Sequence, residues 1–268
     1  MEHSSPGILI LILILLGPGI YFSRRALAGA RYYLRKIRGI DEISHSIACS
    51  VEQGRPICFS TGMTDVSPLL YACLGILKYV AKLSAKVKIP VLLPVRDPEA
   101  IALVDATMKS AYQEEGRLAN YDPSRIRFLS SDQLAYASGY QGIVHRENAG
   151  ACFLFGSFAA EPLILSEAGS KLGAKQIAGT VSNEQIPFFV VSCDYTLLGE
   201  ELYATSAYLS GDPVQVGSLR GQDFSKLFIL LVFVLGVLIK SLHNFEVLSL
   251  DNYIESVISA GWGVLKYL

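Results

Sequence analysis

Two long uncharged stretches near the ends of the chain flank a central region in which short apolar runs alternate with helical patterns. The first stretch, residues 4–23, contains no charged side chain. A helix needs about 20 apolar residues to cross the hydrocarbon core of a bilayer. The second, residues 227–239, extends to Leu242 and makes a short span if Lys240 reaches its amine to the headgroups. The pattern predicts one transmembrane helix within residues 1–23 and another within residues 219–243.

The order of charges around the first stretch predicts its orientation. A cleaved signal peptide carries its basic residues before the apolar part, whereas here the basic residues follow it, so we expect an uncleaved anchor. Basic residues next to a span stay on the cytoplasmic side, and they can bind anionic lipid headgroups at about 1 kcal/mol each. The candidate headgroup contacts are Arg24, Arg25, Arg31, Arg35, Lys36 and Arg38. We therefore expect a protein of the cytoplasmic (inner) membrane with its N-terminus outside and its main domain inside.

Two further segments have helical periodicity. Apolar residues recur at three- and four-residue steps in residues 24–54, which predicts a basic juxtamembrane helix. This helix either packs on its own domain or forms a contact between subunits. Residues 244–268 contain an amphipathic pattern between Asp251 and Leu268. With two spans this tail lies outside, either on the membrane surface or against a neighbouring subunit.

The central region, residues 55–218, alternates buried-type strands with helices. Such alternation predicts a Rossmann-like, doubly wound α/β domain with a mostly parallel sheet. The expected strands are residues 56–60, 89–95, 126–129, 151–155, 175–178 and 187–192. The expected helices are residues 68–86, 98–118, 132–147, 159–172 and 196–209.

Composition and motifs exclude several classes of function. Net charge is −1, and only 18% of residues are charged, so the chain has no basic field for nucleic acid. The five cysteines have no CxxC spacing, which argues against structural zinc and a disulfide framework. The sequence has no GxGxxG, GxxxxGK[ST] or GxSxG motif. A single histidine in the central region, His145, provides neither a metal site nor a catalytic triad. The sequence identifies no cofactor.

Polar residues follow the predicted strands. Ligands of open parallel sheets bind at the carboxyl ends of the strands, so these residues are expected along one edge. The candidates are Ser60, Thr61, Gly62, Asp65, Ser157, Glu161, Thr180, Asp194 and Glu200. One interpretation is that these residues bind a nucleotide phosphate or another small anion at helix N-termini. The other is that they are only the helix caps that every α/β domain needs.

Several strings in the chain resemble a family of prokaryotic membrane proteins known only as a domain of unknown function. The strings are GSFAAE at residues 156–161, QIAGT at residues 176–180 and CDYTLLGEEL at residues 193–202. The similarity extends over residues 55–226. It implies a prokaryotic membrane protein and carries no activity.

The absence of a catalytic constellation favours a non-catalytic membrane scaffold that self-assembles through its cytoplasmic α/β domain. The expected partners are membrane lipid and further copies of the chain. One alternative is an enzyme or sensor that binds a nucleotide, or another small molecule, at the strand ends. Another is a subunit of a transporter or larger membrane complex, which needs partners because two spans alone form no pathway.

Overall fold

The computed structural model describes residues 6–30, 32 and 37–244. These residues belong to two compact units, which are described separately below. One unit contains residues 37–211, and the other contains the described residues up to 32 together with residues 212–244.

The larger unit is built on a six-stranded sheet with the order β3-β2-β1-β4-β5-β6. All neighbouring strands run parallel, as the register of Ile57 with Val91 on one side and Ala151 on the other illustrates. The order reverses between β1 and β4, as in dinucleotide-binding Rossmann domains. The strands are β1 (Ile57–Gly62), β2 (Val91–Val95), β3 (Ile126–Phe128), β4 (Ala151–Ser157), β5 (Lys175–Thr180) and β6 (Tyr195–Leu198). The expected doubly wound α/β fold is confirmed, and its sheet is entirely parallel.

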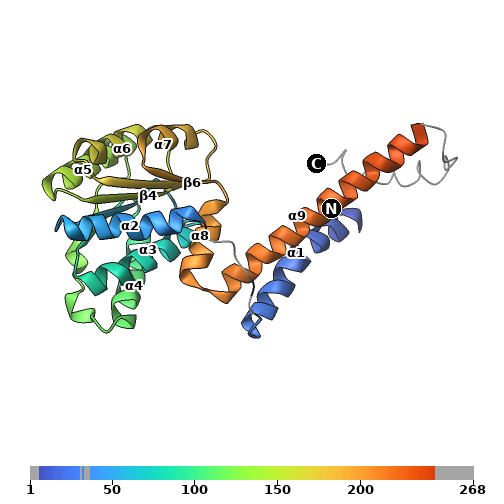
Figure 1. Cartoon of the computed structure of the whole chain (residues 1–268), viewed down its shortest axis with the longest axis horizontal. Coiled ribbons are helices and arrows are strands. Elements are labelled where there is room, and N and C mark those ends of the chain that lie inside the picture. Colours follow the sequence, from blue (N-terminus) through green and yellow to red (C-terminus); the bar gives the residue numbers. More distant parts are fainter. Residues whose placement is uncertain (1–5, 31, 33–36, 245–268) are drawn as a thin grey trace. The chain divides into compact units, whose positions relative to one another are not determined.

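Helices cover both faces of the sheet. Figure 1 shows α5, α6 and α7 on one face and α2, α3, α4 and α8 on the other. Each face has its own cluster of buried apolar side chains, one around Phe59, Phe153 and Leu77 and the other around Tyr136 and Phe189. The helices are α2 (Arg38–Glu52), α3 (Pro68–Val87), α4 (Pro98–Glu114), α5 (Gln133–Arg146), α6 (Pro162–Lys171), α7 (Ile186–Ser192) and α8 (Glu201–Ser210).

Helix α2 belongs to the core of this unit. The helix predicted over residues 24–54 is interrupted, because an earlier helix ends at Leu27, Gly29 takes a left-handed φ of 97° and α2 begins at Arg38. Ile43 and Ile47 of α2 are buried in the cluster that covers the sheet. Of the two interpretations of this segment, packing on its own domain therefore holds for α2.

The end of the sheet differs from the prediction. Residues 187–192, expected to be a strand, form helix α7, and the last strand is Tyr195–Leu198, which was assigned to the start of a helix. A short apolar run does not distinguish a buried strand from a helix. Pro187 in the first turn favours the helix because its fixed φ suits that position. After β6, Gly199 with φ 54° turns the chain into α8.

The smaller unit consists of two antiparallel helices, α1 (Pro6–Leu27) and α9 (Pro213–Asn244). They meet at a seam of small residues spaced four apart on α9, namely Gly217, Gly221 and Ser225, all buried. A Cβ at Gly221 would overlap the backbone of Gly19, and Ser225 Oγ donates a hydrogen bond of 3.2 Å to the carbonyl of Leu15. Such spacing allows the closest backbone approach between membrane helices.

Helix α9 is long and apolar enough to cross a membrane. Its apolar window is only 6% buried, whereas α3, which passes the same test of length and composition, is 67% buried inside the α/β unit. Helix α3 is therefore a core helix, and a membrane crossing by α1 or α9 stays a prediction. Helix α9 starts at Pro213, ahead of the predicted boundary at residue 219. The predicted amphipathic tail between Asp251 and Leu268 lies outside the described residues.

The burial of α2 leads to a test of its place in the core. We expect Ile43→Ala to lower the free energy of unfolding by about 2–5 kcal/mol, because it leaves a cavity under the sheet. The matched control, Glu42→Ala, changes an exposed neighbour and should shift stability by no more than about 0.5 kcal/mol. Chemical denaturation of the full-length protein in detergent compares the two. Equal stability of both variants would contradict the assignment of α2 to the core.

Candidate functional site

Most of the predicted site residues lie at the carboxyl edge of the sheet, where the strand order reverses. Those from β1 and β4 meet across the middle of this edge. Thr180 ends β5 on one side of them, and Glu200 follows β6 as the residue before α8. The residues at this edge are Ser60, Thr61, Gly62, Asp65, Ser157, Glu161, Thr180 and Glu200.

Asp194 is the exception, because it precedes β6 and lies at the amino edge. Its carboxylate accepts hydrogen bonds from the backbone N–H of Gln176 at 2.8 Å and from Lys175 Nζ at 3.1 Å. The hydrogen bond and charge of Asp194 raise the pKa of Lys175. The expected position of Asp194 was wrong because strand β6 had been placed too early in the chain. A hollow of about 360 Å³ beside it also contains Cys193 and Val191.

The loops after β1 and β4 are hydrogen-bonded to each other across the switch point. Met63 N donates to Ser157 O at 2.8 Å, and Ser157 N donates to Thr64 Oγ1 at 2.7 Å. The Thr64 hydroxyl in turn donates to Thr61 O at 2.5 Å. Because Thr64 is almost fully buried, these bonds are shielded from water and join the two halves of the sheet at its centre.

Two glycines allow this close approach. Gly156 has φ 151°, and a Cβ there would overlap the carbonyl oxygen of Thr61. Gly62 has φ 58°, and a Cβ there would lie 2.5 Å from the ring of Phe158. In a dinucleotide-binding domain, glycines at this position let the backbone approach a pyrophosphate. Here the buried Phe158 side chain packs against Gly62 instead.

Ser60 is held in a buried chain of hydroxyl groups. Its Oγ lies 2.6 Å from Tyr136 Oη and accepts a hydrogen bond of 3.0 Å from Gly62 N. Tyr136 donates to the carbonyl oxygen of Pro94 at 3.2 Å. Burial raises the pKa of Tyr136 well above its usual value, so the phenol stays protonated at neutral pH. The arrangement supports α5 against β1 and β2.

Glu161 is the predicted residue whose surroundings are hardest to explain by packing alone. Its side chain has 0% exposure, and its Oε2 accepts hydrogen bonds from Gln133 Nε2 at 2.6 Å and Ala159 N at 3.1 Å. Within the described residues, its Oε1 has no hydrogen-bond partner. The residue stands directly before Pro162, at the N-terminus of α6, where the helix dipole favours a negative charge. It is a structural carboxylate whose second oxygen can accept a hydrogen bond from a ligand.

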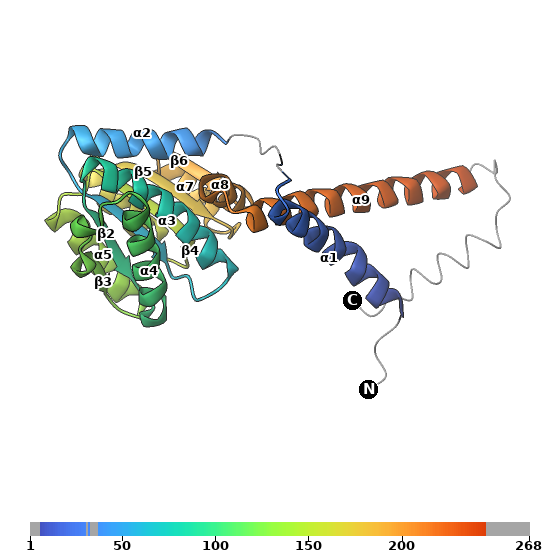
Figure 2. The same ribbon diagram turned by 90° about the horizontal axis from the view of Figure 1, so that it is seen from below.

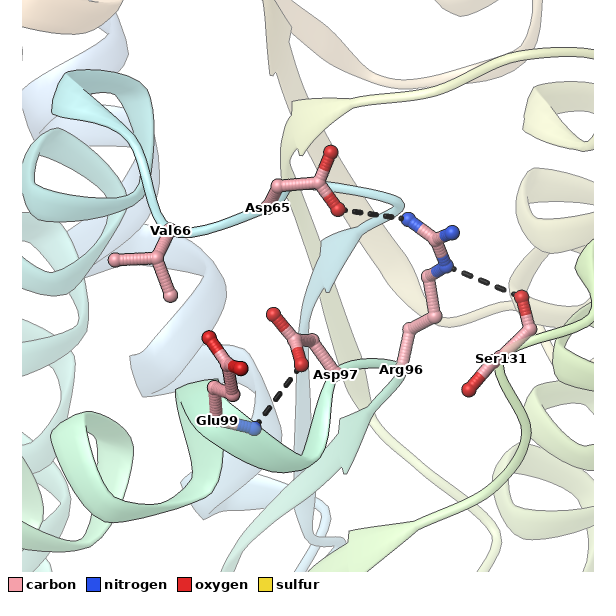
Figure 3. Close-up of a pocket in the computed structure, with 6 residues that line it drawn as sticks. All are labelled: Asp65, Val66, Arg96, Asp97, Glu99 and Ser131. Atoms are coloured by element: carbon pink, nitrogen blue, oxygen red, sulfur yellow. Dashed lines mark hydrogen bonds and ion pairs between the residues drawn. The ribbon is translucent and has the colours of Figure 1, made fainter.

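A hollow of about 340 Å³ opens at the same edge beside Arg96 (Figure 3). Arg96 Nη1 donates to Asp65 Oδ1 at 3.1 Å and to Met63 O at 3.0 Å, and Nε donates to Ser131 O at 3.2 Å. Asp97 caps α4 through Glu99 N at 3.0 Å. The hollow thus contains one guanidinium, already paired, against the carboxylates of Asp65, Asp97 and Glu99. Its charge disfavours a phosphate or another anion.

The sequence interpretation missed the side chains that hold this edge together. Thr64, Gln133 and Tyr136 were not candidates, because a lone threonine or tyrosine in a helix or turn carries no motif. Every predicted ligand-binding residue except Asp194 lies at the expected edge. Ser60 and Glu161, however, form hydrogen bonds there with other side chains of the protein. In the described part of the chain, no three His, Cys, Asp or Glu side chains are grouped as metal ligands.

The predicted lipid contacts lie in different parts of the chain. Arg24 and Arg25 lie in the last turn of α1 and are exposed. Arg38 starts α2. Arg31, Arg35 and Lys36 lie outside the described residues. Headgroup binding by this cluster stays a prediction.

Thiol labelling tests whether the amino-edge hollow holds a reactive cysteine. Burial raises the pKa of Cys193 to about 12, that of Cys73 to about 12 and that of Cys152 to about 11. A raised pKa keeps these thiols protonated and unreactive at neutral pH. We expect N-ethylmaleimide at pH 7.5 to modify the half-exposed Cys49 first, as read by mass spectrometry of the native protein. Labelling of Cys193 as fast as Cys49 would contradict this and indicate an activated thiol.

The closure of the switch point is tested at Gly156. We expect Gly156→Ala to destabilise the protein by about 2–4 kcal/mol, from backbone strain and overlap with Thr61. Gly142→Ala is the matched control, because Gly142 lies in α5 with open space around its Cβ position. Alanine there should stabilise the helix by about 0.5–1 kcal/mol. Thermal unfolding of both variants gives the comparison, and equal melting temperatures would show that the loops are not closed.

Comparison with known proteins places the chain in a family without assigning it an activity. No curated protein and no solved structure matches it significantly. One family model, described as a domain of unknown function (DUF6754), matches residues 2–250, well beyond the strings at residues 55–226. Because the match covers nearly the whole chain, the protein belongs to the DUF6754 family.

Proposed function

We propose that the protein is a membrane-anchored scaffold that self-assembles, with an α/β domain that provides contact surfaces and no catalytic centre. The observation that carries this proposal is an apolar surface on α7. Phe188, Val190 and Val191 of this helix are exposed, Val191 to 87%. The α7 helix, IPFFVVS, contains no charged residue. We call Phe188, Val190 and Val191 the α7 surface.

Two further exposed apolar residues, Val181 after β5 and Leu198 at the end of β6, lie at the carboxyl edge of the sheet. Strand β6 is an edge strand with β5 as its neighbour. An exposed apolar cluster beside an open sheet edge is typical of a protein contact. A second copy of the chain is the partner that a scaffold requires.

Anchoring is supported by the smaller unit. Residues 227–239 of α9 are apolar, and every described side chain among them is at least 40% exposed around the whole helix. A helix that is apolar on all sides is covered by lipid or by protein. The exposed Arg24 and Arg25 at the end of α1 favour the topology with the N-terminus outside and the α/β domain in the cytoplasm.

A second candidate is a small-molecule sensor, favoured by the buried Glu161 with its unpartnered oxygen. The closed switch point and the carboxylates around Arg96 disfavour nucleotides and other anions, so this function would require a cationic or hydrogen-bond-donating ligand. A thermal-shift screen separates the candidates. The scaffold predicts no saturable stabilisation by common nucleotides, whereas the sensor predicts a ligand response that Glu161→Gln removes without loss of the fold.

Assembly is tested with a charge placed on the α7 surface. We expect Val191→Asp to weaken association of the full-length protein in detergent by about 100-fold or more, because a carboxylate would be buried in an apolar contact. Val87→Asp, at an exposed position on α3, is the matched control and should leave association unchanged. Mass photometry over a range of concentrations gives the oligomer distribution.

The outcome for the unaltered protein decides the proposal. A wild-type protein that stays monomeric at all accessible concentrations contradicts the scaffold function. Oligomers that Val191→Asp and Val87→Asp leave equally intact would show that the α7 surface is not the contact.

A further inference from the structure

The seam between α1 and α9 determines which parts of the two helices lie level with each other. Leu15 meets Ser225, Gly19 meets Gly221 and Ser23 meets Gly217. The two residue numbers of each pair sum to 240, as expected for antiparallel helices with equal rise. The uncharged part of α1, from Pro6 to Ser23, is therefore level with residues 217–234 of α9.

This register places charged and apolar residues at the same depth. The matching stretch of α9 contains Arg220, Asp223 and Lys226, whereas the level part of α1 exposes Leu16 and Ile20. In lipid, the charges of Arg220 and Asp223 would each be costly to insert. In water, the exposed leucine and isoleucine of α1 would be left uncovered. No single boundary between water and lipid satisfies both helices, so this level of the pair needs a partner on its charged side.

The charged side of α9 faces away from α1. With 3.6 residues per turn, Asp223 and Lys226 fall opposite the seam formed by Gly217, Gly221 and Ser225, and Arg220 flanks them. Arg220 and Asp223 are exposed, and neither forms an ion pair within the described part of the chain. Figure 2 shows α1 diverging from α9 beyond the seam. We call Arg220, Asp223 and Lys226 the outer face of α9.

We propose that the outer face of α9 binds the same face of a second copy, with Asp223 of each copy paired to Arg220 of the other. This inference rests on the proposed self-assembly in a membrane. Opposite charges three residues apart make the face self-complementary, and a two-fold axis forms both pairs at once. A second copy carries its charges at the same depth as the first. Pairing places the charged side chains between the two copies and leaves the apolar helix α1 facing lipid. Charged residues within membrane helices face the interior of a bundle in this way.

This contact and the α7 surface have different consequences for assembly. A two-fold contact closes on itself and ends at a dimer. The α7 surface belongs to the other unit of the chain, so it provides a separate contact. A chain with two separate self-contacts can continue to grow, which is what a scaffold needs.

The experiment uses charge exchange in the full-length protein. Leu230→Cys places a thiol on the same side of α9 as Asp223, and oxidation in membranes then reports the dimer as a disulfide-linked species. We expect Asp223→Arg and Arg220→Asp each to reduce this cross-linking tenfold or more through like-charge repulsion. The double variant, Arg220→Asp with Asp223→Arg, should restore it because the pairs re-form with reversed sign. Glu52→Arg, at the exposed end of α2, is the charge-reversal control and should have no effect.

The readouts separate this inference from the proposed function. Cross-linking that survives both single reversals, or that the double variant fails to restore, overturns the pairing of Asp223 with Arg220. If mass photometry still finds oligomers in that case, the scaffold function stands with the α7 surface as its contact. A wild-type protein that is monomeric in mass photometry and does not cross-link overturns both.

Discussion

The hydroxyl group of Thr64 connects the two halves of the sheet, and much of the structure depends on this connection. By accepting from Ser157 N and donating to Thr61 O, it joins the loops after β1 and β4 at the point where the strand order reverses. In related architectures this point is open and binds a ligand. Here the close approach needs glycine at residues 62 and 156. The same bonds that stabilise the centre of the sheet therefore hold the two loops together at the point where ligands of this fold usually bind.

The strand–helix alternation was sufficient to predict the fold class, because buried parallel strands are continuous apolar runs that periodicity detects. The prediction of α3 and α4 succeeded for a second reason, since Pro68 and Pro98 mark their first turns. It failed at residues 187–198, where a seven-residue helix and a four-residue strand are too short to show a period. That error moved Asp194 to the wrong edge, because the position of a residue relative to its strand decides its edge.

The candidate site shows what a list of strand-end residues leaves out. Ser60 and Glu161 were identifiable from position alone, since residues near the end of a strand, or in the loop that follows it, lie at the carboxyl edge. Their partners Tyr136 and Gln133 come from α5, more than twenty residues away from either. Long-range hydrogen bonds depend on how α5 packs over the sheet, and a single sequence carries no signal for them. Whether a polar strand end is a ligand contact or a packing contact is decided by these partners.

The seam of the smaller unit illustrates a different limit of sequence reasoning. Small residues four apart are visible at Gly217, Gly221 and Ser225, but a hydropathy window starts the span later, at the first uncharged residues. The structure pairs this small-residue stretch with the middle of α1, so the apolar lengths of the two helices are offset. That offset brings Asp223 level with apolar α1 residues. Two helices that each look like simple spans thus form a pair with one polar side, and this polar side is the feature on which the proposed two-fold contact rests.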